Sequence, residues 1–94
     1  MKKYELLYII SADQTEEQRD LLIEKFKKFI EERKGSIIGI DKWGIKKLAY
    51  PIKFKNEGFY VLMNFEAETT VIREMEDLMN ITEPIVRKMF VVKE

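Results

Sequence analysis

The paired lysines inside an apolar, extended segment are the residues of this sequence with the clearest chemical potential. Residues 44–53 read Gly-Ile-Lys-Lys-Leu-Ala-Tyr-Pro-Ile-Lys, so cations alternate with side chains suited to a core. The sequence has no cysteine and no histidine, which removes thiol chemistry and the usual acid–base group near neutral pH. Cationic strands without a nucleophile or metal ligand beside them predict that the chain binds an anion and does not transform it.

The charges of the chain cancel in total but are unevenly distributed. The net charge is zero over 94 residues, yet residues 36–64 carry five lysines against two carboxylates. Residues 65–83 carry one arginine against six carboxylates. This polarity predicts that an anionic partner approaches one side of the molecule, although the solvated faces of an ordinary soluble domain can show the same pattern.

The sequence lacks the residue combinations that common catalytic sites require. Ser11 and Ser36 are the only serines, and neither has a base beside it. An acylphosphatase would need an arginine and glycines in the loop after the first strand, and residues 11–14 contain neither. The sequence shows no metal-loop or glycine-rich phosphate motif. We therefore expect no enzyme activity, cofactor, metal or small-molecule substrate.

The length and hydrophobic patterning predict one domain over residues 1–94. No apolar run approaches the roughly 20 residues that span a bilayer, so we expect a cytoplasmic protein that does not bind membranes. Strands are predicted at residues 4–10, 36–54, 59–65 and 85–92, with helices after Thr15 and after Thr69 or Thr70. This β-α-β-β-α-β order predicts an α+β, ferredoxin-like fold, a four-stranded antiparallel sheet with two helices on one face.

Local signals predict where these elements begin, end and bend. Thr15 and Gln18 form a capping-box pattern, and Gly35 is expected at a left-handed helix end. Either Thr69 or Thr70 is expected to cap the second helix. Further expectations concern the long second strand: bulges or bends at Gly39 and Gly44, an edge position because of Pro51, and a hairpin turn at residues 55–58.

The sheet face away from the helices is predicted to be apolar. Alternation places on it Leu7, Ile9, Tyr60, Leu62, Phe90 and Val92. An exposed patch of this kind predicts a protein interface, unless a bulge flips one strand to the other face. An RNA-recognition motif has the same topology, but residues 55–65 match its base-stacking strand poorly, and Phe59 is expected in the core.

The lysine segment also resembles a known family. The pattern Gly44-x-Lys46-Lys47-Leu48-Ala49-Tyr50-x-Ile52-Lys53 is similar to the signature of the bacterial small-subunit ribosomal protein S six family. Residues 3–5, Trp43, residues 56–60 and residues 86–93 agree with it, so the resemblance covers essentially the whole chain. Members of that family often carry arginine at the positions of Lys46 and Lys47.

The resemblance implies a ferredoxin-like structural component of the 30S ribosomal subunit. It implies binding of 16S ribosomal RNA together with ribosomal protein S eighteen. The residues expected to face RNA are Lys2, Lys3, Lys46, Lys47, Lys53, Lys55, Arg87 and Lys88, whereas Trp43 and Tyr50 are expected to be structural. The alternative is a non-catalytic homodimeric or regulatory ferredoxin-like module, since a homodimer would use the same apolar face.

Overall fold

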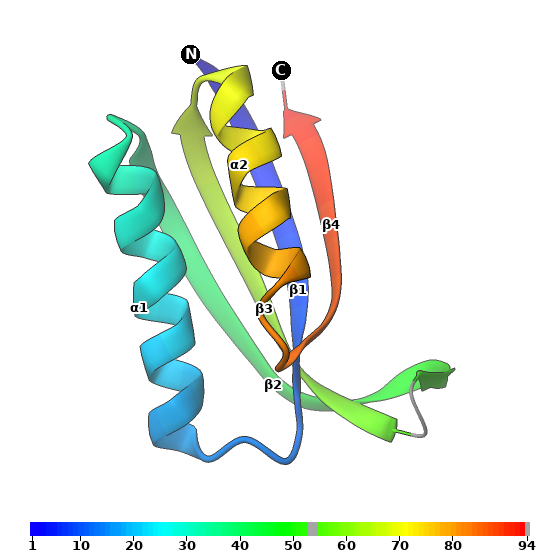
Figure 1. Ribbon diagram of the computed structural model, residues 1–94. Coiled ribbons are helices and arrows are strands. Elements are labelled where there is room, and N and C mark those ends of the chain that lie inside the picture. The colour runs from blue at the N-terminus through cyan, green and yellow to red at the C-terminus, as the bar shows by residue number, and fades with distance from the viewer. Residues whose placement is uncertain (53–54, 94) are drawn as a thin grey trace.

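The sheet and its two helices follow the predicted order. The computed structural model describes residues 1–52 and 55–93, without the side chains of residues 49–52 and 55. The elements are β1 (Lys2–Ser11), α1 (Glu16–Glu32), β2 (Ser36–Ile52), β3 (Lys55–Ala67), α2 (Thr69–Asn80) and β4 (Ile85–Lys93). The strands form one sheet in the order β2-β3-β1-β4, and all neighbours are antiparallel. Both helices cover one face, and the β2–β3 hairpin extends beyond them (Figure 1). The ferredoxin-like prediction is confirmed.

Strand β1 determines which side chains enter the core. It pairs with β3 on one side and β4 on the other, so both of its edges are hydrogen-bonded. Its even-numbered residues, Tyr4, Leu6, Tyr8 and Ile10, are buried under the helices. Their partners on β3 are Phe65, Met63, Val61 and Phe59, and the first three of these are fully buried. The predicted alternation of both strands is therefore confirmed, including the placement of Phe59 against the core.

Helix α1 begins at the predicted capping box. The Gln18 amide donates to the Thr15 hydroxyl at 3.1 Å, and the Thr15 amide donates to the Gln18 side chain at 2.9 Å. Two backbone donors at the helix start are thus satisfied. The helix buries Ile23, Phe26 and Ile30 in the core.

The end of α1 differs in one residue from the prediction. Lys34, not Gly35, adopts the left-handed conformation, with φ of 66°. The Lys34 amide donates to Glu31 O at 3.1 Å and the Gly35 amide to Ile30 O at 2.9 Å, which is a Schellman motif. Glycine is needed at position 35 for space, because a Cβ there would lie 2.9 Å from the backbone oxygen of Glu66.

Helix α2 starts one residue earlier than a threonine cap would require. Its N-cap is Glu68, whose side chain makes no capping hydrogen bond, so the prediction of Thr69 or Thr70 is wrong. The Thr69 hydroxyl instead accepts a hydrogen bond from the Tyr4 hydroxyl at 3.3 Å. Val71, Met75 and Met79 point into the core, as the helical spacing predicts.

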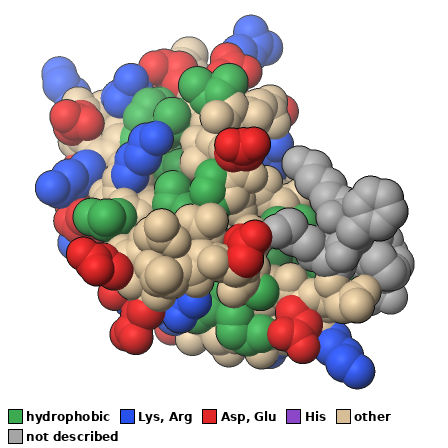
Figure 2. Space-filling view, turned by 60° about the horizontal axis from the view of Figure 1, so that its bottom comes forward, with side chains coloured by type: hydrophobic (Ala, Val, Ile, Leu, Met, Phe, Trp, Pro, Cys, Tyr) green, Lys and Arg blue, Asp and Glu red, His purple; other side chains and the backbone are tan. Residues whose placement is uncertain are grey.

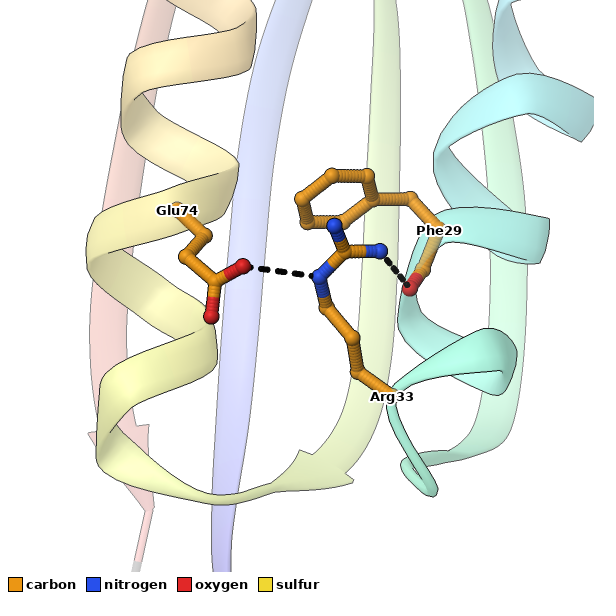
Figure 3. A network of polar contacts seen from close by, with 3 residues as sticks. All are labelled: Phe29, Arg33 and Glu74. Carbon is orange, nitrogen blue, oxygen red and sulfur yellow. Dashed lines mark hydrogen bonds and ion pairs between the residues drawn. The ribbon is translucent and has the colours of Figure 1, made fainter.

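An arginine joins the two helices on their outer side. Arg33 Nε donates to Glu74 Oε2 at 2.9 Å, and Arg33 Nη1 donates to the backbone oxygen of Phe29 at 3.3 Å (Figure 3). The guanidinium carbon lies 3.6 Å from the centre of the Phe29 ring. These contacts hold Arg33 between α1 and α2, on the far side of the sheet from the face described below.

The hairpin between β2 and β3 is longer than predicted. Residues 55–58 are not a turn, because β3 begins at Lys55 and pairing continues to Ile52 opposite Lys55. Gly58 lies inside β3, where a Cβ would come within 2.2 Å of Ile9 Cγ2. This glycine therefore makes room for a neighbouring side chain. The edge position of β2, predicted from Pro51, is confirmed.

The hydroxyl of Tyr8 gives a prediction about stability. It is buried without a hydrogen-bond partner among the described residues, and burial raises the pKa of the phenol well above its usual value. Tyr8→Phe should raise the free energy of unfolding by about 1 kcal/mol near pH 7, because it removes an unsatisfied buried group. The unfolded chain releases the Tyr8 proton from about pH 10 upward while the folded chain retains it, so wild-type stability falls there.

Urea unfolding of wild type and Tyr8→Phe between pH 7 and pH 11 measures both effects. The advantage of the variant should widen above about pH 10. A variant that is less stable than wild type at every pH would show that the hydroxyl makes a favourable interaction.

Candidate functional site on the open sheet face

The sheet face away from the helices, called the open face here, has an apolar centre and charged ends. The ladder places Leu7 between Leu62 and Met89, and Glu5 between Asn64 and Val91. At one end, Lys3 lies between Glu66 and Lys93. At the other end, Ile9 lies between Tyr60 and Arg87, and Lys46 lies opposite Gly58. The face thus combines apolar contact area with cations at both ends.

Two residues of the predicted protein-partner face lie on the other side. The predicted side of the sheet is right for Leu7, Ile9, Tyr60 and Leu62 and wrong for Phe90 and Val92. Phe90 pairs with Leu6 and Val92 pairs with Tyr4, and paired residues of antiparallel strands share a face. Phe90 therefore packs against the helix-covered core. Met89 and Val91 occupy the open face instead, with 50% and 42% of their surface exposed.

Two bulges in β2 add apolar side chains that alternation did not predict for this face. The β2–β3 register shifts between Ile37 and Gly39 and again between Lys42 and Gly44, which confirms the bulges predicted from the two glycines. The extra residues are Ile38 and Trp43. Ile38 lines a shallow hollow with Lys3, Asn64 and Lys93, so it lies on the open face. A bulge puts two residues opposite one and thereby re-aims a side chain.

Trp43 and Tyr60 form an aromatic pair at the hairpin end of the open face. Their rings are stacked, with centroids 6.4 Å apart and planes 10° from parallel. Lys46 Nζ lies 4.9 Å from the centre of the Trp43 ring. Trp43 is 44% exposed, so a large part of the indole remains accessible. The expectation that Trp43 is structural accounts for its stacking on Tyr60 but not for this exposure.

The residues predicted to face RNA fall in three places. Lys3 lies on the open face at the start of β1, and Lys46 lies on it at the hairpin. Their exposed neighbours Lys2 and Lys47 pair with Ala67 and Glu57 on the other side of the sheet. Lys46 pairs with Gly58, which pairs with Ser11, so its row lies eight residue steps along β1 from Lys3. Eight steps correspond to roughly 26 Å along an extended strand. Arg87 is exposed on the open face beside Ile9.

A further candidate is held on the helix side of the sheet. Lys88 pairs with Tyr8 on the helix side and donates to Asn80 Oδ1 at 2.5 Å. Lys53 lies outside the described residues, and the side chain of Lys55 is not described. Sequence reasoning missed Lys93, which lies across from Lys3 and forms an ion pair of 3.3 Å with Glu5.

The electrostatics of the open face are close to balanced. Among the described residues the ladder places on it four cations and three carboxylates, namely Lys3, Lys46, Arg87, Lys93, Glu5, Asp41 and Glu66. Figure 2 views the molecule from below and partly from the helix side, and there too both signs of charge are interspersed with hydrophobic side chains. A surface like this attracts a polyanion only weakly through charge, so contact area must contribute to its affinity.

The described part of the chain offers little for other kinds of site. Within residues 1–52 and 55–93, no three acidic side chains gather closely enough to hold a metal ion. Neither α1 nor α2 has the length and apolar character of a membrane-spanning helix. The hollow beside the first loop, lined by Ser11, Asp13, Glu83 and Pro84 among others, is about 330 Å³ and opens to solvent.

Comparison with known proteins decides the family. A family model described as ribosomal protein S6 matches residues 3–92. The chain belongs to the ribosomal protein S6 family. The small ribosomal subunit protein bS6 of Caldanaerobacter subterraneus subsp. tengcongensis is 48% identical over 91 residues, covering 97% of this chain and 96% of that protein. The bS6 protein of Clostridium novyi is 44% identical over 94 residues, covering 100% and 99%.

A solved structure agrees with this assignment. The crystal structure of 30S ribosomal protein S6 from Thermotoga maritima matches with a TM-score of 0.93 at 36% identity, covering 98% of this chain and 87% of that one. The predicted family and fold are therefore confirmed. Membership of a family of ribosomal proteins also confirms the predicted non-catalytic class and the predicted cytoplasmic, ribosomal location.

The bulge that presents Trp43 gives a matched pair of substitutions. Gly44 has φ of 89°, a conformation that L side chains rarely adopt, whereas Gly39 does not have a positive φ. A Cβ at either position would meet nothing within 4 Å. Gly44→Ala should therefore lower the free energy of unfolding by about 1–2 kcal/mol, from backbone conformation alone.

Gly39→Ala is the control, and it should be neutral or stabilising by up to about 1 kcal/mol. Urea unfolding followed by circular dichroism measures both variants. Equal effects of the two substitutions would show that the backbone at Gly44 is not strained by a side chain.

Proposed function

We propose that this chain is a structural component of the 30S ribosomal subunit that binds 16S ribosomal RNA together with ribosomal protein S eighteen. The observation that carries the proposal is the open face of an S6-family fold, with its apolar centre and cationic ends. Leu7, Leu62, Met89 and Val91 supply contact area for a protein. Lysines on the hairpin and at the start of β1 supply charge for phosphates.

The two partners have separate roles in this proposal. Exposed lysines on strands neutralise phosphates without reading base edges, so they position the chain on a folded RNA. The net charge of zero gives little long-range attraction. Binding to RNA should therefore be much stronger when the partner protein covers the apolar centre, because each contact then holds the chain in place for the other.

Charge reversal on the hairpin tests the RNA contact. Lys46→Glu combined with Lys47→Glu should leave the fold intact, because both side chains are exposed. The double variant should bind the complex of 16S central-domain RNA and ribosomal protein S eighteen more weakly. The slope of log K against log salt should become shallower by about 1–2, since about 0.7–0.9 is lost per phosphate contact.

The matched control reverses the same charge elsewhere. Lys25→Glu with Lys28→Glu changes two exposed lysines of α1, on the helix layer. The control should retain the wild-type salt slope in filter-binding measurements at several salt concentrations. If the hairpin variant and the control have the same slope, Lys46 and Lys47 do not contact phosphate.

A second pair of variants tests the apolar centre. Leu62→Asp adds a charge on the open face and should block association with ribosomal protein S eighteen while the chain still unfolds cooperatively. Phe90→Asp adds a charge on the helix side and should lower the free energy of unfolding by about 3–5 kcal/mol, because Phe90 packs against the core.

Sedimentation with and without the partner, together with urea unfolding, separates these outcomes. The wild-type chain alone should sediment as a monomer. Self-association of the wild type that is lost in Leu62→Asp would support the homodimeric module instead. Unimpaired association of Leu62→Asp with the partner would remove the open face from that interface.

A further inference from the structure

We propose that Trp43 provides a stacking surface for an unpaired nucleobase of the bound RNA. This inference rests on the proposed function and adds a contact of a different chemical kind to it. The lysines would meet phosphate, whereas the indole would meet the flat face of a base. Stacking on an aromatic side chain is tolerant of sequence, since every base has a π face.

The first support is the way in which the backbone presents the indole. Trp43 is the extra residue of a bulge in β2, and Gly44 after it has φ of 89°. A bulge re-aims a side chain, and the positive φ of Gly44, which glycine adopts without strain, permits the turn of the backbone beside Trp43. With planes only 10° apart, the rings of Trp43 and Tyr60 present nearly parallel surfaces. The platform is therefore preorganised by paired strands.

The second support is that the side chain of Trp43 is exposed, unlike the aromatic side chains of the core. Trp43 is 44% exposed, whereas Tyr4, Tyr8 and Phe65 are almost completely buried. The exposed part of an indole is a large apolar surface, and leaving it in water costs free energy that a stacked base would recover. If Trp43 served only to stabilise the fold, a side chain that packs completely on Tyr60 would be sufficient.

The third support is the cation beside the ring. Lys46 Nζ lies 4.9 Å from the centre of the Trp43 ring, and neither residue is buried. A nucleotide carries both a flat base and a phosphate, so it can contact the indole and the ammonium together. An apolar protein side chain on Trp43 would instead remove water from the Lys46 charge without replacing it, which is unfavourable. The pair therefore favours a nucleotide over a protein partner at this end.

Three variants separate stacking from charge. Trp43→Leu retains an apolar side chain but loses the flat ring, Trp43→Phe retains a ring, and Lys46→Ala removes the charge. Each is bound to 16S central-domain RNA in the presence of ribosomal protein S eighteen over a salt series. Trp43→Leu should bind about ten-fold more weakly or worse with an unchanged salt slope, and Trp43→Phe should recover most of the affinity. Lys46→Ala should instead give a shallower slope.

The outcomes are distinguishable from failure of the proposed function. If the wild type does not bind RNA and partner, both proposals are overturned. If the wild type binds and Trp43→Leu binds equally well, only the stacking proposal is overturned. It is also overturned if Trp43→Leu weakens association with the partner protein in the absence of RNA. Circular dichroism melting of each variant excludes loss of the fold as the cause.

The indole itself gives an independent readout. Trp43 is the single tryptophan of the sequence, so the fluorescence of the free chain reports on this residue. Titration with an unstructured single-stranded RNA should quench the fluorescence, whereas polyphosphate of equal charge should not. Equal quenching by RNA and polyphosphate would contradict stacking, because polyphosphate carries no base.

Discussion

The register of β1 against its two neighbours is the constraint on which the rest of this structure depends. Because β1 is paired on both edges, a shift of one residue would exchange Tyr4, Leu6 and Tyr8 with the residues of the open face. The fully buried Leu6 and Tyr8 pack beneath the helices, and Phe26 meets Tyr8 edge-on with ring centres 5.4 Å apart. The packing of the helix layer thus determines, through the register, which side chains the other face offers to partners.

The side chains of the open face are determined by that register together with the bulges that interrupt it in β2. Regular alternation supplies Leu7, Leu62, Met89 and Val91, and the bulges of β2 add Ile38 and Trp43. Cations lie toward the ends of the face and carboxylates lie among them, so charge alone gives little affinity. The surface is therefore suited to composite binding, in which a protein covers the apolar centre and RNA meets the lysines and the indole.

Several features were predictable because local chemistry decides them. The capping box at Thr15 and Gln18, the alternation of β1 and β3, and the bulges at Gly39 and Gly44 each depend on residues close in sequence. The face of β4 was not predictable in this way. Met89, Phe90, Val91 and Val92 are all apolar, so the pattern of the strand leaves its orientation open, and only pairing with β1 resolves it.

Two other incorrect predictions, both about glycines, have a similar physical origin. Glycine is the usual left-handed residue at a helix end, but Gly35 is required by the nearby Glu66 backbone, and Lys34 adopts the strained conformation instead. Gly58 suggested a turn, whereas it leaves space for Ile9 within the sheet. In both cases a contact distant in sequence determines the role of the glycine. The candidate cations could be chosen from the sequence, but their separation into three places required the topology.

Hydroxyl-radical footprinting of the chain, free and within small ribosomal subunits, is the most direct test of the claim that the open face is the binding surface. Trp43, Leu62 and Met89 should lose reactivity in the subunit if the open face is the binding surface. Leu21, which is 65% exposed on α1, should remain reactive. Loss of reactivity at Leu21 and Ile81, with Trp43 and Met89 unchanged, would show that the chain binds through its helices and would contradict the account.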